Sequence, residues 1–318
     1  MKHLRWCNTI VFMVMVVAIS IGGAGSCAFG EVYVSGAEGI EGATVPPPGL
    51  HIRNYNMLIT DNVVKDGNGN SVPVIDPHFV IYANVTRALY VSNFKLLGAD
   101  VGAGIALPFL YPNMKMRGIG YSDDQPQFGD IQVDPFILAW HGSRYDATIG
   151  IGFFAPTGLG NHTKTVNLGS DCWTGMLTVG GTLYLDEART WSASILSRYE
   201  MHSDRQDIDL RNGDDFHFEW GLGKTLPVNW FGGIWKVGAS GYAQWQVTGD
   251  SGNSYLNTGV TDRVFAAGPE IDFLYPLPPD SCFAPLKAFG VWLRSQWEFG
   301  AVDRPRGNRT TLVLGFSF

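Results

Sequence analysis

The feature that most constrains this chain is an alternation of apolar with polar or small residues, which recurs from residue 49 to the last residue. In YDATIGIGFF, for example, Tyr145, Ile149 and Phe153 fall on one face of an extended chain, and Asp146 and Thr148 fall on the other. Because successive side chains of a strand point to opposite faces, this period of two predicts β-strands with one apolar face each. Many windows are about ten residues long, the length that a tilted strand needs to cross a bilayer.

A soluble β-sandwich also alternates in this way, so the period alone does not identify what covers the apolar faces. Two further features favour a membrane barrel. The opposite faces contain charges, such as Glu200 and Glu298, that the buried face of a sandwich would not tolerate. Aromatic residues bound the apolar faces at the strand ends, like the two girdles of a membrane barrel, at Tyr111, Tyr145, Trp191, Tyr199, Trp220, Trp235, Trp245, Tyr275 and Trp297.

The windows number about twelve, an even number as a closed bacterial outer-membrane barrel requires. We expect strands near residues 50–61, 78–90, 97–111, 128–140, 145–154, 173–186, 190–202, 215–224, 235–248, 263–274, 287–299 and 308–318. Long polar links follow the odd-numbered strands, and short links such as HGSR and DEAR follow the even-numbered ones. With both termini in the periplasm, the long links lie outside the cell, as in other outer-membrane barrels. The exception is YPLPPDSCFAPL, which leaves the strand bounds near 275–287 open.

The N-terminus has the layout of a secretory signal peptide. Lys2, His3 and Arg5 precede the apolar run TIVFMVMVVAISI, and the small-residue stretch GGAGSCAFG follows it. We expect a signal peptide over residues 1–28, with cleavage after Ala28 or Gly30. The alternatives are a transmembrane anchor, which the short uncharged run does not favour, and lipidation at Cys27. Either way, the protein is exported.

We expect residues 29–48 to form an irregular periplasmic or lumenal segment, and residues 49–318 to form the barrel. The stretch EVYVSGAEGIEGATVPPPG has no clean period and ends in three prolines, Pro46 to Pro48. It either plugs the pore from the periplasmic side or remains an exposed tail, and composition does not separate the two.

Charge and cysteine content exclude some classes of protein. The formal net charge is −7 at pH 7, and it becomes more negative when the signal peptide is removed, so nucleic acid is not an expected partner. On the predicted topology Cys172 is extracellular and Cys282 is periplasmic, so the two should not be bonded to each other. Acidic clusters, at Asp209, Asp214 and Asp215 and at Asp250 with Asp262, do not match the spacing of a calcium loop. We therefore expect no metal and no cofactor.

The chain ends in TTLVLGFSF, a strand that stays apolar on one face to its last residue. We expect this strand to pair with the first and close the barrel, with one row of side chains in lipid. The row also resembles the C-terminal signal that the outer-membrane assembly machinery recognises, so that machinery and outer-membrane lipid are expected partners. The signal consists of Leu312, Leu314, Phe316 and Phe318.

The strand parity also predicts which side chains line the lumen. In GDIQVDPFI we expect Ile131, Val133 and Ile137 on the outer face. The lumen-lining candidates, taken from all windows, are Asp100, Asp130, Gln132, Asp134, Asp146, Arg198, Glu200, His217, Glu219, Gln244, Glu270, Asp272, Arg294 and Glu298. A charge facing lipid at the midplane costs about 2–4 kcal/mol, so this inward row is required whatever the function. We expect Arg198 and Arg294 to pair with neighbouring carboxylates, and the excess of carboxylates to disfavour anionic solutes.

An enzyme built on a barrel is the third possibility, as in an outer-membrane phospholipase with Ser, His and Asn on its outer face. The candidate histidines are His51, His78, His141, His162, His202 and His217. Parity turns His202 and His217 toward the lumen, and none lies beside a serine in a motif that positions a nucleophile. We therefore expect that the protein is not an enzyme.

Several further stretches are distinctive, namely GAEGIEGATVPPPGLHIRNYN, FGDIQVDPFILAW, FFAPTGLGN with NLGSDCW, TGDSGN and AAGPEI. Together they resemble the outer-membrane proteins named for the phenol meta-degradation pathway, often labelled transporters. The resemblance implies a barrel associated with uptake of aromatic or other hydrophobic compounds. The substrate itself does not transfer with the family label.

The sequence thus predicts an all-β fold, a closed antiparallel transmembrane β-barrel of about 12 strands in the outer membrane of a Gram-negative bacterium. The expected function is the passive passage of small hydrophobic or aromatic compounds. The alternative is a narrow, occluded barrel with a structural or surface-interaction role.

Overall fold

The computed structural model describes residues 32–73, 76–158, 169–206, 208–253 and 259–318. The predicted signal peptide, residues 1–28, and residues 29–31 of the segment that follows lie outside the described residues. Among the described residues, no helix is long and apolar enough to cross a membrane.

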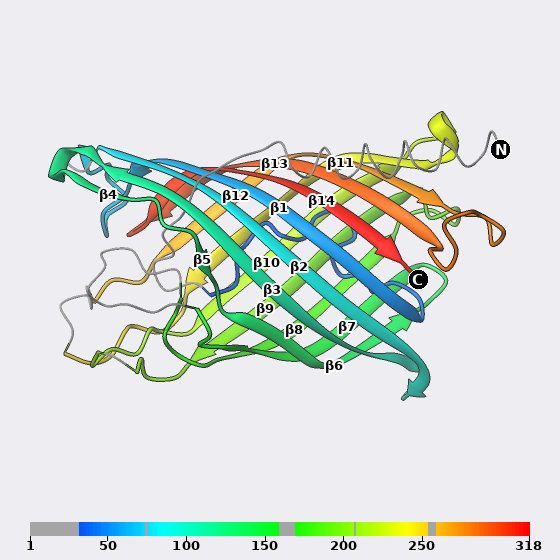
Figure 1. The fold of residues 1–318 in the computed structure, drawn as a ribbon, viewed down its shortest axis with the longest axis horizontal. Helices are drawn as coiled ribbons and strands as arrows, with labels where there is room; N and C mark the ends of the chain where they lie inside the picture. Colours follow the sequence, from blue (N-terminus) through cyan, green and yellow to red (C-terminus); the bar gives the residue numbers. More distant parts are fainter. Residues whose placement is uncertain (1–31, 74–75, 159–168, 207, 254–258) are drawn as a thin grey trace.

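Twelve long antiparallel strands form a closed barrel, as the sequence predicted (Figure 1). Two short strands, β4 (Tyr121–Asp123) and β5 (Gln127–Phe128), pair with β3 outside this ring. The barrel strands are β1 (Gly49–Val64), β2 (Pro77–Leu96), β3 (Ala99–Met116), β6 (Ile131–His141), β7 (Tyr145–Ala155), β8 (Thr174–Tyr184), β9 (Trp191–His202), β10 (Asp215–Thr225), β11 (Ile234–Gln246), β12 (Arg263–Pro276), β13 (Ala288–Val302) and β14 (Pro305–Ser317).

The last strand closes the barrel against the first. β14 pairs antiparallel with β1, with Ile52 opposite Phe316, and the backbone N–H of Phe318 donates to the carbonyl of Leu50 at 2.8 Å. In β14 the buried side chains alternate with the row of Leu312, Leu314 and Phe316, so that row faces outward. Pairing through the final residues explains why the chain remains apolar to its end.

The two ends of the barrel differ in their links. One end, which we call the turn end, holds the C-terminus and the links 97–98, 142–144, 185–190, 226–233 and 277–287 (Figure 1, right). The other, which we call the loop end, holds the described parts of the links 65–76, 117–130, 156–173, 203–214 and 247–262, and the link 303–304. The link 303–304 is shorter than the sequence predicted. The reason is that β14 starts at Pro305, whereas the last strand was expected to start near residue 308. Cys172 is a buried free thiol and Cys282 is disulfide-bonded, so the two are not bonded to each other, as predicted.

One predicted side-chain direction is wrong. Ile137 was placed on the outer face with Ile131 and Val133, but it is buried, with 7% exposure. The registers of β6 shift between Val133 and Phe136, and a bulge at this point exposes Pro135. Proline cannot donate to the ladder and is tolerated at bulges, and the extra residue reverses the parity of everything that follows.

Most outward faces are apolar, but β1 and β2 carry a polar network on that side. Asn54 Oδ1 accepts from Nδ2 of Asn56 at 2.8 Å and from Nδ2 of Asn84 at 3.1 Å, and the Tyr82 hydroxyl donates to Asn56 Oδ1. We call Asn54, Asn56 and Asn84 the outer asparagine network. The inward side of this region holds an apolar cluster, formed by Tyr55, Met57, Ile59, Ile81, Ala83, Leu110 and Val313. In this part of the wall, polar side chains face outward and apolar side chains face inward, which is the reverse of the arrangement elsewhere in the barrel.

Candidate functional site

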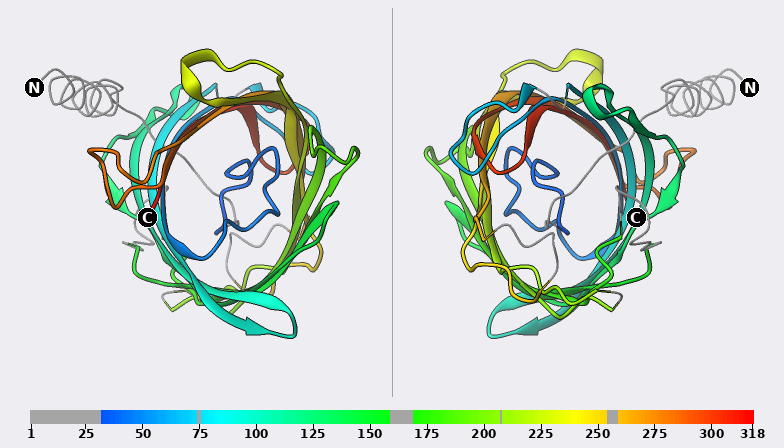
Figure 2. Two further views of the ribbon diagram at one scale, coloured as in Figure 1. Left: turned by 90° about the vertical axis from the view of Figure 1, so that its right-hand side faces the viewer. Right: turned by 90° about the vertical axis from the view of Figure 1, so that its left-hand side faces the viewer.

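Residues 32–48, here called the inner segment, lie inside the barrel (Figure 2, blue). The segment has no regular strand or long helix, and Tyr33, Ser35, Glu38, Ile40 and Ala43 are buried in it. Backbone N–H and C=O groups without secondary structure need other partners when they are buried. The inward side chains of the barrel strands supply those partners, and several of them are residues that the sequence marked as lumen-lining.

Glu219 on β10 is the first anchor of the inner segment. Its carboxylate accepts from the backbone N–H groups of Gly36 at 2.7 Å and Glu38 at 3.1 Å, and from the Tyr33 hydroxyl at 3.0 Å. Arg198 Nη1 donates to the same carboxylate at 2.8 Å, as the expected ion pair. The guanidinium also lies over the Tyr33 ring, 4.0 Å from its centroid. One buried carboxylate therefore binds three residues of the segment and one cation.

A second anchor joins β12 and β13 to the segment. Arg294 Nη1 donates to Glu270 Oε1 at 2.8 Å, again as expected, and Arg294 Nε donates to the carbonyl of Gly36 at 3.1 Å. Arg294 also donates to the carbonyl of Ala37, and Glu270 Oε2 accepts from the backbone N–H of Ile40 at 3.1 Å. A charged pair thus satisfies both a carbonyl and an N–H of the irregular chain.

The inner segment contributes one carboxylate of its own, on Glu38. It accepts from Arg53 at 3.0 Å, from Arg87 at 3.3 Å and from the Tyr55 hydroxyl at 3.0 Å. Arg87 also donates to Asp134 at 2.9 Å. Glu38 therefore ties the segment to β1 and β2, on the side of the barrel away from β10.

Toward the turn end, Thr44 fixes the segment to β7 and β8. Its Oγ1 lies within hydrogen-bonding distance of two acceptors, 3.1 Å from an Asp146 carboxylate oxygen and 3.0 Å from the Thr182 hydroxyl oxygen, and the N–H of Ala43 donates to Ser194 at 3.2 Å. Lys236 pairs with Glu41 nearby. The segment is thus held along its length by strands on every side.

A cavity of about 70 Å³ remains between the inner segment and the wall formed by β1, β2 and β6 to β9. Part of its lining is apolar, including Leu89, Ile137, Met176 and Leu196. The charged lining consists of Glu38, Arg53, Arg87, Asp134 and Arg198. Each of these charges has an opposite partner described above, so the lining is polar without an unpaired charge among them.

The other predicted lumen residues are buried but do not share one place. Asp130 lies at the loop end, where it accepts from Gly158 N–H and from Ser170. Asp100 lies near the turn end beside Lys95, and Gln132 Nε2 donates to Asp134 at 2.9 Å. Glu298 accepts from Tyr242 and forms an ion pair with Arg309, whose Nε lies 3.3 Å from Glu298 Oε1. Gln244 and Asp272 are also buried, at 0% and 6% exposure.

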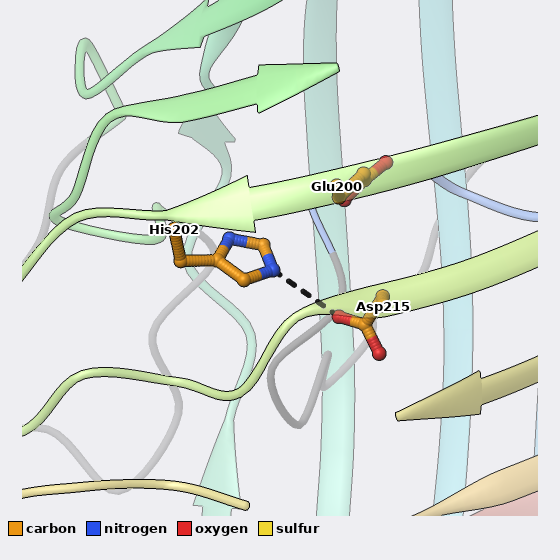
Figure 3. A group of neighbouring side chains, drawn as sticks. All are labelled: Glu200, His202 and Asp215. Atoms are coloured by element: carbon orange, nitrogen blue, oxygen red, sulfur yellow. Dashed lines mark hydrogen bonds and ion pairs between the residues drawn. The ribbon is translucent and has the colours of Figure 1, made fainter. Parts of the chain in front are cut away.

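Glu200 belongs to a further group at the loop end, with His202 and Asp215 (Figure 3) and with His217. Glu200 Oε1 lies 3.2 Å from His217 Nε2, and the His217 ring stacks on Tyr33 with centroids 5.0 Å apart. On the same strand as Glu200, His202 Nε2 lies 3.2 Å from Asp215 Oδ2. Glu200, His202, Asp215 and His217 are each 3% exposed or less.

Sequence reasoning missed the residues of the inner segment that touch the wall, namely Tyr33, Glu38 and Thr44. A segment without a period has no face to predict, and its partners lie more than a hundred residues away in the chain. The signal that could have predicted partners inside the lumen was the large number of charges on the inward faces of the strands. The sequence named His51 among the candidate histidines but not its contacts: Nδ1 lies 2.9 Å from the Ser317 hydroxyl, and Nε2 donates to the carbonyl of Pro47 at 2.7 Å.

Comparisons with known proteins agree with this architecture. The family model described as Putative MetA-pathway of phenol degradation matches residues 62–313. No curated protein matches the chain. The COG4313 outer membrane channel from Pseudomonas putida F1 is similar in fold, with a TM-score of 0.68 and 16% identity over 91% of this chain and 100% of that one.

Two other solved barrels are less similar. The β domain of the Bordetella autotransporter BrkA has a TM-score of 0.47 and 12% identity, over 86% of this chain and 99% of that one. A mutant of the TodX monoaromatic hydrocarbon channel has a TM-score of 0.39 and 12% identity, over 91% of this chain and 99% of that one.

Proposed function

Since the chain belongs to the family described as Putative MetA-pathway of phenol degradation, we propose that it passes small neutral aromatic or hydrophobic compounds passively across the outer membrane. The protein is a twelve-stranded outer-membrane barrel of a Gram-negative bacterium. The proposed partners are therefore the solute, the surrounding lipid and the barrel assembly machinery, which would recognise Leu312, Leu314, Phe316 and Phe318.

The observation that carries the proposal is the cavity beside the inner segment. Leu89, Met176 and Leu196 give the cavity apolar surface. A hydrophobic solute therefore enters it at a small cost in free energy, because its apolar surface stays out of water. Each of the cavity's charged side chains has an opposite partner, so a solute ion would have to compete with that partner. A neutral solute meets no such competition, and this is why we propose neutral compounds rather than aromatic acids.

The cavity is narrow for this task. A pocket of about 150 Å³ binds benzene, whereas this cavity measures about 70 Å³. Passage of a ring therefore requires side chains such as Met176, or part of the inner segment, to move. The same narrowness favours the second candidate, an occluded barrel with a structural or surface-interaction role.

We do not assign catalysis to this barrel. The arrangement most like a catalytic triad is Thr174, His202 and Asp215, in which Thr174 Oγ1 lies 2.8 Å from His202 Nδ1. Thr174 is 0% exposed, so its hydroxyl is out of reach of a substrate carbonyl. His51 beside Ser317 has a backbone carbonyl rather than a carboxylate on its other nitrogen, and it fastens the seam between β1 and β14.

The proposal is tested by changing the width of the cavity at one residue. Met176 is buried in its lining, and Leu177, the next residue of β8, points outward with 43% exposure. In liposomes carrying the refolded barrel, Met176→Ala should speed the entry of neutral aromatic solutes and Met176→Trp should slow it. Leu177→Ala is the matched control and should leave entry unchanged. Equal entry of the solutes through the wild type and all three variants would favour the occluded barrel.

A further inference from the structure

Glu200, His202 and Asp215 converge at the loop end of the barrel (Figure 3). Each offers one possible ligand atom, and these atoms lie within 4.8 Å of one another. We propose that the three side chains form a binding site for a divalent transition-metal ion, with Zn²⁺ as the ion of the right chemistry. This inference departs from the sequence-based expectation of no metal, and it does not depend on the proposed transport function.

The first argument is charge. Glu200 and Asp215 are directly opposite each other in the register of β9 and β10. Two like charges in this position destabilise a strand pair, and both residues are 3% exposed or less, so water screens them little. A divalent cation between the two carboxylates would remove this repulsion.

The second argument is an unused ligand atom. Glu200 Oε1 lies near His217, but among the described residues no hydrogen-bond partner reaches Glu200 Oε2, although Glu200 is fully buried. Leaving a buried carboxylate oxygen unsatisfied is costly, and native structures rarely do so without a reason. A metal bond at Oε2 would satisfy it.

The barrel provides an internal contrast at its turn end. There His141 lies 3.1 Å from Asp146 and 3.7 Å from Asp100, so a histidine again sits between two carboxylates. In that cluster Arg189 pairs with Asp146 and Lys95 pairs with Asp100. Protein cations already compensate those carboxylates, whereas Glu200 pairs, within the described residues, with the imidazole of His217.

The third argument is the orientation of the imidazole. His202 Nδ1 lies 2.8 Å from the Thr174 hydroxyl, on the side of the ring away from Asp215. If Nδ1–H donates to Thr174, the lone pair of Nε2 points at the carboxylates. Metal-binding histidines are held in this way by a partner on the second ring nitrogen, which fixes the tautomer.

The ligand set also selects the ion. Calcium and magnesium prefer oxygen ligands alone, whereas imidazole with carboxylates suits zinc and its neighbours. Zinc bonds of about 2.0–2.2 Å place neighbouring ligand atoms roughly 3.3–3.6 Å apart in a tetrahedron. His202 Nε2 and Asp215 Oδ2 are already 3.2 Å apart, and the ligand atom of Glu200, which lies within 4.8 Å of theirs, would have to move closer to complete three ligands. Water would take the fourth position.

A metal at this place would join the last residue of β9 to the first of β10. These two residues bound the link 203–214, so the ion would fasten the base of that link. Glu200 also touches His217, which stacks on Tyr33 of the inner segment.

The test is metal binding by the full-length mature barrel, refolded without a polyhistidine tag and treated with a chelator. We expect one Zn²⁺ or Co²⁺ per chain, with the visible absorption of four-coordinate Co²⁺. His202→Ala and Glu200→Gln should weaken binding by at least about 100-fold, and Thr174→Val by about 10–100-fold. His141→Ala, which removes the histidine of the other cluster, should bind as the wild type does.

Glu200→Gln is nearly isosteric, so it keeps the test valid if the alanine variant does not fold. Absence of bound ion in the folded wild type would overturn the proposal. So would binding that persists in both Glu200→Gln and His202→Ala, since the ion would then lie elsewhere.

Discussion

The carboxylate of Glu219 accepts a 2.7 Å hydrogen bond from the backbone N–H of Gly36, a residue 183 positions earlier in the chain. This bond joins the wall of the barrel to the segment inside it. Gly36 has a positive φ of 91°, and a Cβ there would lie 2.6 Å from Gln296 Oε1. Glycine is therefore needed both for the backbone conformation and for the close approach of the wall. At this position the sequence of the inner segment therefore matches the space that the barrel wall leaves.

Glu219→Gln should loosen the inner segment. Four donors converge on the Glu219 carboxylate, and an amide offers one acceptor oxygen in place of two while adding an N–H₂ group that faces donors. Hydrogen bonds to charged groups contribute about 1.5–3 kcal/mol, so the Gly36 and Glu38 amides should exchange with deuterium at least about tenfold faster. Hydrogen exchange followed by mass spectrometry measures this directly. Unchanged exchange at both amides would show that Glu219 does not hold the segment.

Asp130→Asn should loosen the link 156–173 and leave the inner segment unchanged. Asp130 Oδ1 accepts from Gly158 N–H at 2.8 Å, and Oδ2 accepts from the N–H and the hydroxyl of Ser170 at 2.7 and 2.6 Å. The two ends of the link are thus held by one carboxylate. Exchange at Gly158 and Ser170 should rise about tenfold, with Gly36 unaffected. Each variant is the control for the other, and a rise at both sites in both variants would indicate general destabilisation.

The outer asparagine network should respond oppositely to partial and complete removal. Asn84→Leu alone removes one hydrogen-bond partner from each of Asn54 and Asn56 on a lipid-facing surface, and should destabilise the barrel by about 1 kcal/mol. Replacing all three asparagines by leucine removes the three amides together and leaves only the hydroxyls of Tyr82 and Thr86, so it should recover most of that loss. Urea titration of the barrel in lipid vesicles gives both free energies of unfolding. A triple variant less stable than the single one would mean that the network itself stabilises the fold.

Asp186 gives a pH-dependent contact in the link between β8 and β9. Its carboxylate accepts from the N–H of Trp191 and from the N–H and hydroxyl of Thr190, and these bonds hold the pKa of Asp186 below its usual range. Since the folded pKa is the lower one, the stabilisation is complete above the unfolded value of about 3.9 and is lost as the pH falls through the folded value. The Thr190 and Trp191 amide shifts in NMR spectra should titrate with a midpoint below 3.9, and Asp186→Asn should abolish the titration. A midpoint at or above 3.9 would contradict the assignment.

Sequence periodicity predicted the strands well because a membrane barrel forces polarity to alternate along every strand. The pairing of β1 with β14 followed from the apolar C-terminus, and the ion pairs of Arg198 and Arg294 followed from their inward position among carboxylates. Parity failed at Ile137, because a bulge inserts one residue and sequence alternation does not mark where that occurs.

The interior was less predictable than the wall. The inner segment binds through backbone groups and through single side chains such as Tyr33 and Glu38, and nothing local in EVYVSGAEGIEGATVPPPG specifies their distant partners. The metal-site proposal depends on the register that places Glu200 opposite Asp215, which the strand bounds alone did not fix. Both features arise from pairings across the barrel rather than from neighbours in sequence.

The most direct test of the proposed function is solute entry into liposomes that carry the refolded wild-type barrel. Neutral aromatic compounds, sugars and aromatic acids of matched size should be compared with empty liposomes. The account predicts that the neutral aromatics enter fastest, because the cavity beside the inner segment is apolar in part and its charges are paired. Entry of no solute above the rate of empty liposomes, from a barrel shown to be folded, would contradict transport and leave the occluded barrel as the function.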